Sequence, residues 1–377
     1  MELALVRPVP APGAKSARRA PDWVRGVGCA AGLVLSACMD GALVLHSLDS
    51  DGTGPAALAP RAIAAWVGHS GPAQAVAVET GPALPATHDA VAVTGGKDGA
   101  ARLWRLRRRP ADGGARAADS AECCGVLVGH ETSVTCAAWG RGLGSVATGD
   151  WDGQVCLWDS GAASEPGWAA AGAGGDDATK GKAGGSKRQR IAEPAELVED
   201  SSPAARVPAH RGAVGGVAWV SPSRLVTAGW DRTIKIFDPQ HRTDGGAHAA
   251  MIDCGKPCTG LASAAAAGAG GEAIATSHSD GIVRVWDSRA VGGGRAVSLR
   301  GHTAWASSVA WRPGHSHHLA SGSHDGRVAL WDIRAPSGPL HWSIQHDEGQ
   351  KCLGVSWDSP SVVCSGGSDR RVRSAAI

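Results

Sequence analysis

Histidine, serine or threonine, and aspartate recur in the same order along this chain, and these are the residue types that a hydrolase uses for nucleophilic catalysis. One such set consists of His302, Ser321 and Asp325. An enzyme needs its catalytic set only once, whereas this set returns at similar spacing in several places. We therefore interpret the sets as structural and expect no catalytic residue, no cofactor and no small-molecule substrate.

A structural role for these residues follows from hydrogen bonding. A buried histidine can bond to the aspartate, while the hydroxyl group links the histidine ring to a tryptophan indole, and Trp331 completes the set in this way. Each neutral bond contributes roughly 0.5–1.5 kcal/mol net, and loss of one member leaves the others unpaired in a low dielectric. The same order predicts a second tetrad, which consists of His130, Thr148, Asp152 and Trp158.

These residues sit in a repeated segment: a short apolar run, a serine or threonine, an aspartate four residues later, and then alternating apolar residues. Seven aspartates mark the repeats: Asp40, Asp98, Asp152, Asp231, Asp280, Asp325 and Asp369. Five of them precede glycine, and Asp-Gly between apolar runs is a strong hairpin signal. Each segment is therefore predicted to be a β-hairpin, with both faces largely apolar as in a sheet packed between two others.

A further strand precedes most hairpins, and a histidine stands before it. These histidines lie 21 to 29 residues ahead of the turn aspartates, at His69, His130, His210, His302 and His346. Repeat five lacks this histidine, repeat one has His46 at the tryptophan position, and repeat seven has Ala375 there. We expect packing, more than polar networks, to hold those three units.

The repeats resemble those of WD40 proteins, whose period is about 40–45 residues and whose units each form one blade of a β-propeller. The last two intervals between turn aspartates are 45 and 44 residues, and longer ones imply insertions. We predict an all-β, seven-bladed propeller spanning residues 22–377. Residues 160–205, rich in Gly, Ala, Ser and charge, are predicted to be a disordered insert. Within residues 1–21, Glu2–Pro8 is predicted to supply the outer strand of the last blade.

Composition excludes several other classes. Hydrophobic residues make up 43% of the 377, which is enough for a core, and the formal net charge of +2 gives no global field for nucleic acid. No secretory signal or membrane-spanning apolar run is visible. The ten cysteines have no framework spacing and are expected to be reduced. His315–His318 has no cysteine or carboxylate set around it, so no metal site is predicted.

Loops on the faces of the ring are the expected means of binding. The residue before each turn aspartate should lie at the channel mouth: Met39, Lys97, Trp151, Trp230, Ser279, His324 and Ser368. Trp151 and Trp230 stand on adjacent blades, and exposed tryptophans in a polar rim are typical of interface hot spots. Local packing over the turn is the alternative. Trp305, and its counterpart Trp23 on blade one, are added to this candidate partner-binding set.

The chain also resembles one group of propellers, the ribosome-biogenesis WD-repeat-12 family, called Ytm in yeast. The likeness is strongest over residues 299–367 and includes DWV at Asp22–Val24, SACMD at Ser36–Asp40, and the turns Trp151-Asp152 and Trp230-Asp231. It implies a non-catalytic scaffold for maturation of the large (60S) ribosomal subunit and rRNA processing. The implied partners are pescadillo-like and block-of-proliferation-like proteins of a PeBoW-type complex and pre-60S particles, in the nucleolus and nucleoplasm.

Two expectations limit this resemblance. Members usually begin with a ubiquitin-like domain that docks the midasin-type ATPase; Met1 stands near its expected exit, so we expect this domain to be lacking, or the reading frame to be truncated, and the docking to be in doubt. Trp286–Arg289 and Trp331–Arg334 also fit a Trp-Asp-x-Arg pattern found in substrate receptors of cullin-type ubiquitin ligases. A ligase receptor is therefore the alternative function.

The basic cluster Lys187–Arg190 is read either as a nuclear localisation signal or as a solvated loop.

Overall fold

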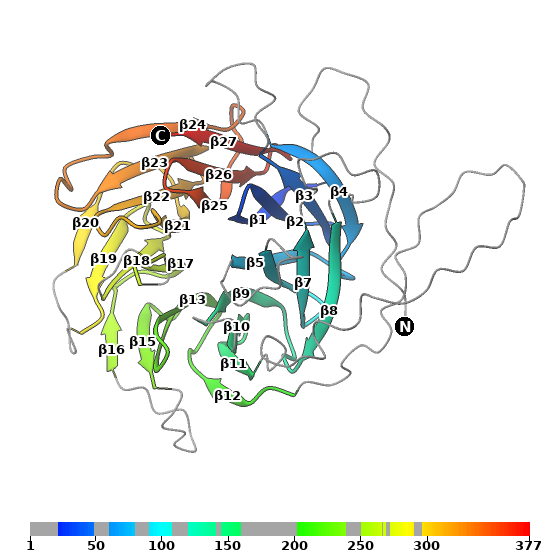
Figure 1. The fold of residues 1–377 in the computed structure, drawn as a ribbon. Coiled ribbons are helices and arrows are strands. Elements are labelled where there is room, and N and C mark those ends of the chain that lie inside the picture. The colour runs from blue at the N-terminus through cyan, green and yellow to red at the C-terminus, as the bar shows by residue number, and fades with distance from the viewer. Residues whose placement is uncertain are drawn as a thin grey trace, which may run out of the picture.

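The structure is a computed structural model that describes residues 22–48, 60–79, 90–107, 120–140, 145–159, 202–238, 250–265, 267–268, 272–289 and 296–377. These residues form twenty-seven strands in seven antiparallel sheets. The sheets stand around a central channel as the blades of a ring (Figure 1). The prediction of a seven-bladed propeller is therefore confirmed.

The first four blades follow the chain from its innermost to its outermost strand. Blade one consists of β1 (Val24–Ala30), β2 (Leu33–Cys38), β3 (Ala42–Ser47) and β4 (Arg61–Val67). Blade two consists of β5 (Ala73–Glu79), β6 (Ala90–Gly96), β7 (Ala100–Arg107) and β8 (Ser120–Val128). Blade three consists of β9 (Val134–Trp139), β10 (Ser145–Asp150), β11 (Gln154–Asp159) and β12 (Ala205–Pro208). Blade four consists of β13 (Val214–Ser221), β14 (Arg224–Gly229), β15 (Thr233–Phe237) and β16 (Ala250–Asp253).

The remaining blades repeat this order. Blade five consists of β17 (Cys258–Ser263), β18 (Ala273–His278), β19 (Val283–Asp287) and β20 (Val297–Leu299). Blade six consists of β21 (Ala306–Trp311), β22 (His318–Ser323), β23 (Arg327–Asp332) and β24 (His341–Gln345). Blade seven consists, within the described residues, of β25 (Cys352–Ser359), β26 (Val362–Gly367) and β27 (Val372–Ala376).

The predicted hairpin turns join the second and third strands of the blades. Gly326 has φ +81° and donates its N–H to the carbonyl of Ser323 at 3.0 Å, which reverses the chain after Asp325. The residue after the turn aspartate is left-handed even where glycine is absent, with φ 69° at Arg232 and 61° at Arg370. The aspartate therefore precedes the position that sets the turn geometry, as the Asp-Gly pattern indicates.

Apolar residues pack between neighbouring blades, because both faces of each sheet are covered. Trp158 and Trp331 are fully buried in two of these layers. The first and last blades also meet: the N–H of Cys29 donates to Ser356 Oγ at 3.2 Å, and that of Gly32 donates to Asp358 Oδ1 at 2.7 Å. The described blades therefore form a closed circle of packing contacts.

Two sequence predictions concern residues outside this description. Residues 1–21, with the strand predicted at Glu2–Pro8, lie outside the described residues. The same holds for residues 160–201 of the predicted insert, and β12 begins at Ala205, the insert's last residue.

Candidate functional site

The predicted tetrad of blade six is assembled in the structure. Nδ1 of His302 lies 3.0 Å from Asp325 Oδ2, and its Nε2 lies 2.8 Å from Ser321 Oγ. The indole N–H of Trp331 donates to the same hydroxyl at 2.7 Å. The His302 side chain is fully shielded from solvent, so the set connects the loop before β21 to β22 and β23 and presents no group to a substrate.

Blade three corrects one prediction. Thr148 and Trp158 contact as expected, and His130 Nε2 lies 2.7 Å from Thr148 Oγ1. The carboxylate at 2.8 Å from His130 Nδ1, however, belongs to Asp150. Asp152, the predicted member, is exposed in the turn.

The position of Asp150 explains this exchange. Blades two, four and seven have Gly96, Gly229 and Gly367 at the equivalent strand end, and a Cβ there would press on the histidine ring. A carboxylate at that point reaches the ring directly, two residues before the usual aspartate. Asp150 Oδ1 also accepts the N–H groups of Asp152 at 3.0 Å and Gln154 at 2.8 Å, so it closes the turn as well.

Arginines extend the networks of blades two and seven. Arg102 donates to Asp98 at 2.8 Å, and Arg373 donates to Asp369 at 3.0 Å. Burial alone would raise the pKa of Asp369, but His346 and then Arg373 lower it to about 2. The sequence signal for these arginines is their place four residues after the turn aspartate, where the same strand brings them alongside.

Blades one and five depart from the expectation that packing, more than polar networks, holds them. In blade one, His46 Nε2 lies 3.0 Å from Ser36 Oγ, at the place of the usual tryptophan. In blade five, His278 on β18 supplies the histidine that the preceding loop lacks, with Nε2 2.8 Å from Thr276 Oγ1. Trp286 donates to that same hydroxyl at 2.8 Å. Blade five therefore has a polar network, built from a different position.

Acid should weaken the fold through His46. Burial lowers the pKa of His46 from 6.5 to about 4, so the unfolded chain binds a proton that the folded chain does not. The contribution is present above pH 6.5 and is lost as the pH falls towards 4, amounting to about 3 kcal/mol at most. We expect the stability measured by urea unfolding to be lower at pH 4.5 than at pH 7, and the His46→Gln variant to show a smaller difference between the two pH values. An unchanged pH dependence in that variant would contradict the assignment.

The residue before each turn aspartate lies on one face of the ring, as predicted. Its N–H donates to a carbonyl in the loop that enters the same blade: Trp230 to Ala213 at 2.9 Å and His324 to Trp305 at 2.8 Å. Met39 donates to Trp23 at 3.0 Å in the same manner. Trp23 is thus the blade-one counterpart of Trp305.

Three tryptophans and a histidine form a continuous cluster on this face, which we call the aromatic cluster: Trp151, Trp230, Trp305 and His324. The ring centroids of Trp151 and Trp230 are 5.7 Å apart, those of Trp230 and Trp305 are 6.5 Å apart, and Trp305 stacks on His324 at 5.8 Å. On blade five, between Trp230 and Trp305, the corresponding residue is the small Ser279. The three tryptophans remain 41–49% exposed.

The other predicted face residues do not join this cluster within the described residues. Trp23 is 45% exposed on blade one, Met39 beside it is half-buried, and Lys97 is exposed on blade two. The face therefore has a continuous aromatic cluster over blades three to six, and Trp23, Met39 and Lys97 lie apart from it on blades one and two.

A cavity of about 530 Å³ occupies the channel beneath the aromatic cluster. All four cluster residues line it, together with polar side chains such as Arg25, Gln74 and Thr135 from the innermost strands. The pKa of His324 is lowered, first by burial and then by the positive charges of Lys351 and Arg25. The mouth thus combines aromatic rings with cationic groups.

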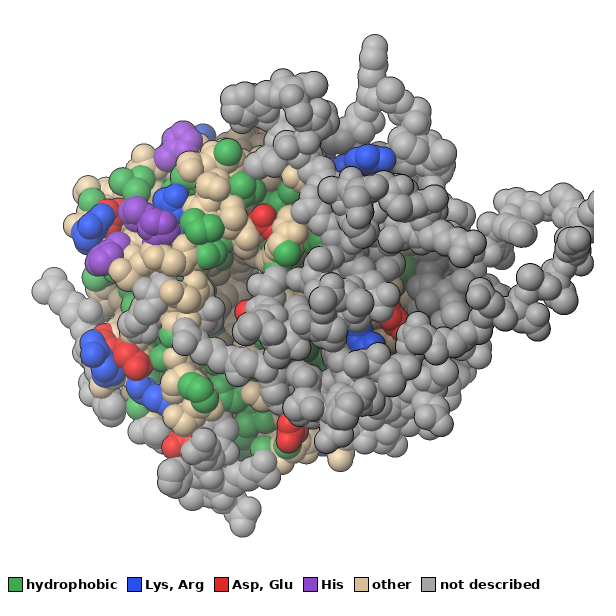
Figure 2. All heavy atoms as spheres, viewed as in Figure 1, with side chains coloured by type: hydrophobic (Ala, Val, Ile, Leu, Met, Phe, Trp, Pro, Cys, Tyr) green, Lys and Arg blue, Asp and Glu red, His purple; other side chains and the backbone are tan. Residues whose placement is uncertain are grey.

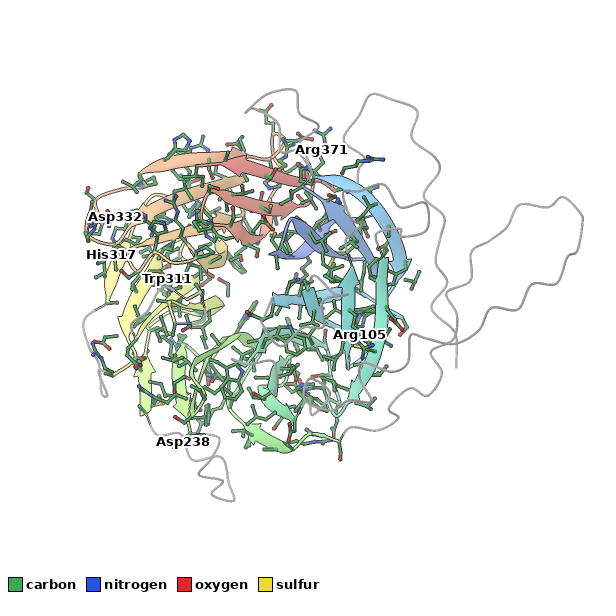
Figure 3. The ribbon with its side chains drawn as sticks, in the orientation of Figure 1. Arg105, Asp238, Trp311, His317, Asp332 and Arg371 are labelled. Carbon is green, nitrogen blue, oxygen red and sulfur yellow. The ribbon has the colours of Figure 1, made fainter. Side chains whose placement is uncertain are left out.

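In each Trp-Asp-x-Arg segment, the arginine forms an ion pair with the aspartate of the same segment. The Arg334 guanidinium lies 2.6 Å from Asp332, and Arg289 lies 2.9 Å from Asp287. Figure 3 places Asp332 and His317 close together at the outer side of blade six, and Figure 2 shows histidines gathered in that region. The loop at His317 joins β21 to β22. It therefore lies on the face of the ring opposite to the one that carries the aromatic cluster.

Comparisons with known proteins agree with this fold. The family model "WD domain, G-beta repeat" matches residues 121–159, 201–238 and 294–332. The chain is 29% identical over 384 aligned residues to the "Ribosome biogenesis protein WDR12 homolog" of Culex quinquefasciatus, covering 99% of this chain and 77% of that protein. The homologue of the same name from Chlamydomonas reinhardtii is 28% identical, with 99% and 80% covered.

A solved structure shares the architecture. The crystal structure of the WD40 β-propeller domain of Doa1 superposes with a TM-score of 0.63 at 18% identity, covering 95% of this chain and 93% of that one. This likeness concerns the fold alone. In the part of the chain that the structure describes, no helix is long and apolar enough to cross a membrane.

Proposed function

Because the chain belongs to the WDR12 family of WD40-repeat proteins, we propose that it is a non-catalytic assembly factor in ribosome biogenesis. The observation that carries this proposal is the similarity to ribosome biogenesis proteins along 99% of the chain. The buried histidine sets support the non-catalytic part, since the His130 and His302 side chains have no solvent-exposed surface.

We propose the aromatic cluster as the surface that captures a partner protein, with Trp23, Met39 and Lys97 as its periphery. Clustered, partly exposed tryptophans bury a large apolar area at a low cost in side-chain entropy and dominate many interfaces. Arg25 and Lys351 beside the cluster favour a partner segment that carries acidic residues next to its apolar anchors.

The proposed partners are pescadillo-like and block-of-proliferation-like proteins and pre-60S particles, with the protein in the nucleolus and nucleoplasm. They follow from the family resemblance, and the propeller supplies a rigid platform on which several chains can meet. Binding of a midasin-type ATPase is not part of this proposal.

Affinity purification of the tagged full chain from its native cells tests the proposal. We expect pescadillo-like and block-of-proliferation-like proteins with large-subunit precursors in the eluate, and accumulation of unprocessed large-subunit rRNA precursors when the protein is depleted. Recovery of a cullin adaptor in place of these proteins, with normal rRNA processing, would overturn it in favour of a ubiquitin-ligase receptor.

A further inference from the structure

The polar network of blade five differs from those of the other blades at the position of the histidine in the entering loop. In blades two, four and seven the histidine of the entering loop donates its backbone N–H to the carbonyl of the residue after the turn aspartate of the preceding blade, as His346 does to Gly326 at 2.8 Å. In blade five, Cys254 makes this bond, to Arg232 at 2.9 Å. Cys254 therefore occupies the position of the missing histidine.

Two more soft or nitrogen ligands surround this cysteine. Cys258 begins β17, and its Sγ lies 3.1 Å from Cys254 Sγ and 3.8 Å from His278 Nδ1. All three residues are buried, and their ligand atoms lie within 4.8 Å of one another. The turn aspartate of this blade, Asp280, pairs with Arg284 at 2.7 Å, and the contacts of His278 are to other groups.

The carbonyl of Lys256 completes a fourth corner. Its oxygen lies 3.6 Å from Cys254 Sγ, 3.9 Å from Cys258 Sγ and 3.3 Å from His278 Nδ1. In a regular tetrahedron with zinc bond lengths, two sulfurs are about 3.8 Å apart, sulfur and nitrogen or oxygen about 3.6 Å, and nitrogen and oxygen about 3.3 Å. The three contacts to the carbonyl and the contact between Cys258 Sγ and His278 Nδ1 agree with this shape, and the sulfur pair must open by roughly 0.7 Å to match it.

The other side of the imidazole has the support that a metal-bound histidine requires. His278 Nε2 lies 2.8 Å from Thr276 Oγ1, which in turn lies 3.3 Å from the Arg284 carbonyl. If the threonine hydroxyl donates to that carbonyl, its oxygen is free to accept N–H groups from both His278 and Trp286. Nδ1 then keeps its lone pair and faces the sulfurs, and the second-shell bond fixes the ring.

We propose that Cys254, Cys258 and His278 bind a zinc ion between blades four and five, with the Lys256 carbonyl or a water as the fourth ligand. Two thiolates balance the dication, so the buried site would be neutral. Zinc would tie the loop between β16 and β17 to strand β18, as the histidine tetrads tie the corresponding loops of other blades. A Cys254–Cys258 disulfide is the competing chemistry, but it gives no role to His278 Nδ1 or to the carbonyl.

Metal analysis of the full chain, purified without chelator, tests this site. We expect about one zinc per chain, and cobalt added to the stripped protein should give the thiolate charge-transfer band and the visible bands of a tetrahedral Cys₂His site. Chelation should lower the melting temperature of the wild-type protein. Absence of zinc together with no cobalt spectrum in the folded chain, or a freshly isolated chain two hydrogens lighter from a disulfide, would overturn the proposal.

A matched pair of variants assigns the ligands. Cys258→Ser should lose zinc and most of the cobalt charge-transfer intensity, whereas Cys352→Ser should keep both. Cys352 is an equally buried cysteine at the start of β25, the equivalent strand of blade seven, and no second cysteine stands in the loop before it. Should Cys258→Ser fail to fold, the spectrum of the cobalt-loaded wild-type protein still decides between the outcomes.

Discussion

Replacing both Trp151 and Trp230 by alanine should weaken binding of the captured partner by at least about 100-fold, while the ring stays folded. Each truncation at a hot spot costs roughly 2 kcal/mol or more, and a 100-fold loss corresponds to about 2.7 kcal/mol, which allows for non-additivity. Trp230 is the central member, because its ring contacts both Trp151 and Trp305. The fold should tolerate the changes, since both side chains are more than 40% exposed.

Titration of the purified partner against the wild-type and variant chains measures this effect. Leu340→Ala is the matched control, because Leu340 is a large apolar side chain, 58% exposed, that lies outside the aromatic cluster. Melting temperatures should be similar for all three chains. Equal affinity of the double variant and the control would move the docking surface away from this face.

The architecture could be predicted from the sequence because its determinants are local. Asp-Gly pairs such as Asp325-Gly326 fix the turns, and the alternating strands around them fix which faces are buried. The position of Trp305 on the same face as His324 also followed from its place three residues after His302. Because the same pattern recurs in seven repeats, one sequence is enough to predict the architecture.

The exceptions arise where one blade departs from the shared register. Asp150 and Asp152 are two residues apart, and only the direction of the strand end decides which reaches His130. His278 was missed because it comes from β18 and not from the loop where the repeat places its histidine. The contact of Trp230 with Trp305 spans blade five and depends on the spacing of loops that no repeat pattern specifies.

Asp150→Ala is expected to destabilise the protein by about 3–5 kcal/mol, whereas Asp152→Ala should cost no more than about 0.5 kcal/mol. Removal of the Asp150 carboxylate leaves His130 Nδ1 and the N–H groups of Asp152 and Gln154 without their acceptor. The His130 and Asp150 side chains are nearly free of solvent, so water cannot replace the lost bonds. Asp152 is exposed, and its truncation removes none of these contacts.

Urea unfolding of the two variants separates the two registers. Asp150→Asn should fall between wild type and Asp150→Ala, because an amide oxygen can still accept the turn N–H groups although it no longer brings a negative charge to His130. A free energy of unfolding that decreases from wild type to Asp150→Asn to Asp150→Ala is expected only if one side chain accepts hydrogen bonds from both the histidine and the turn. A greater loss of stability for Asp152→Ala than for Asp150→Ala would refute this assignment. It would mean that Asp152 binds His130, as the turn aspartate does in other repeats.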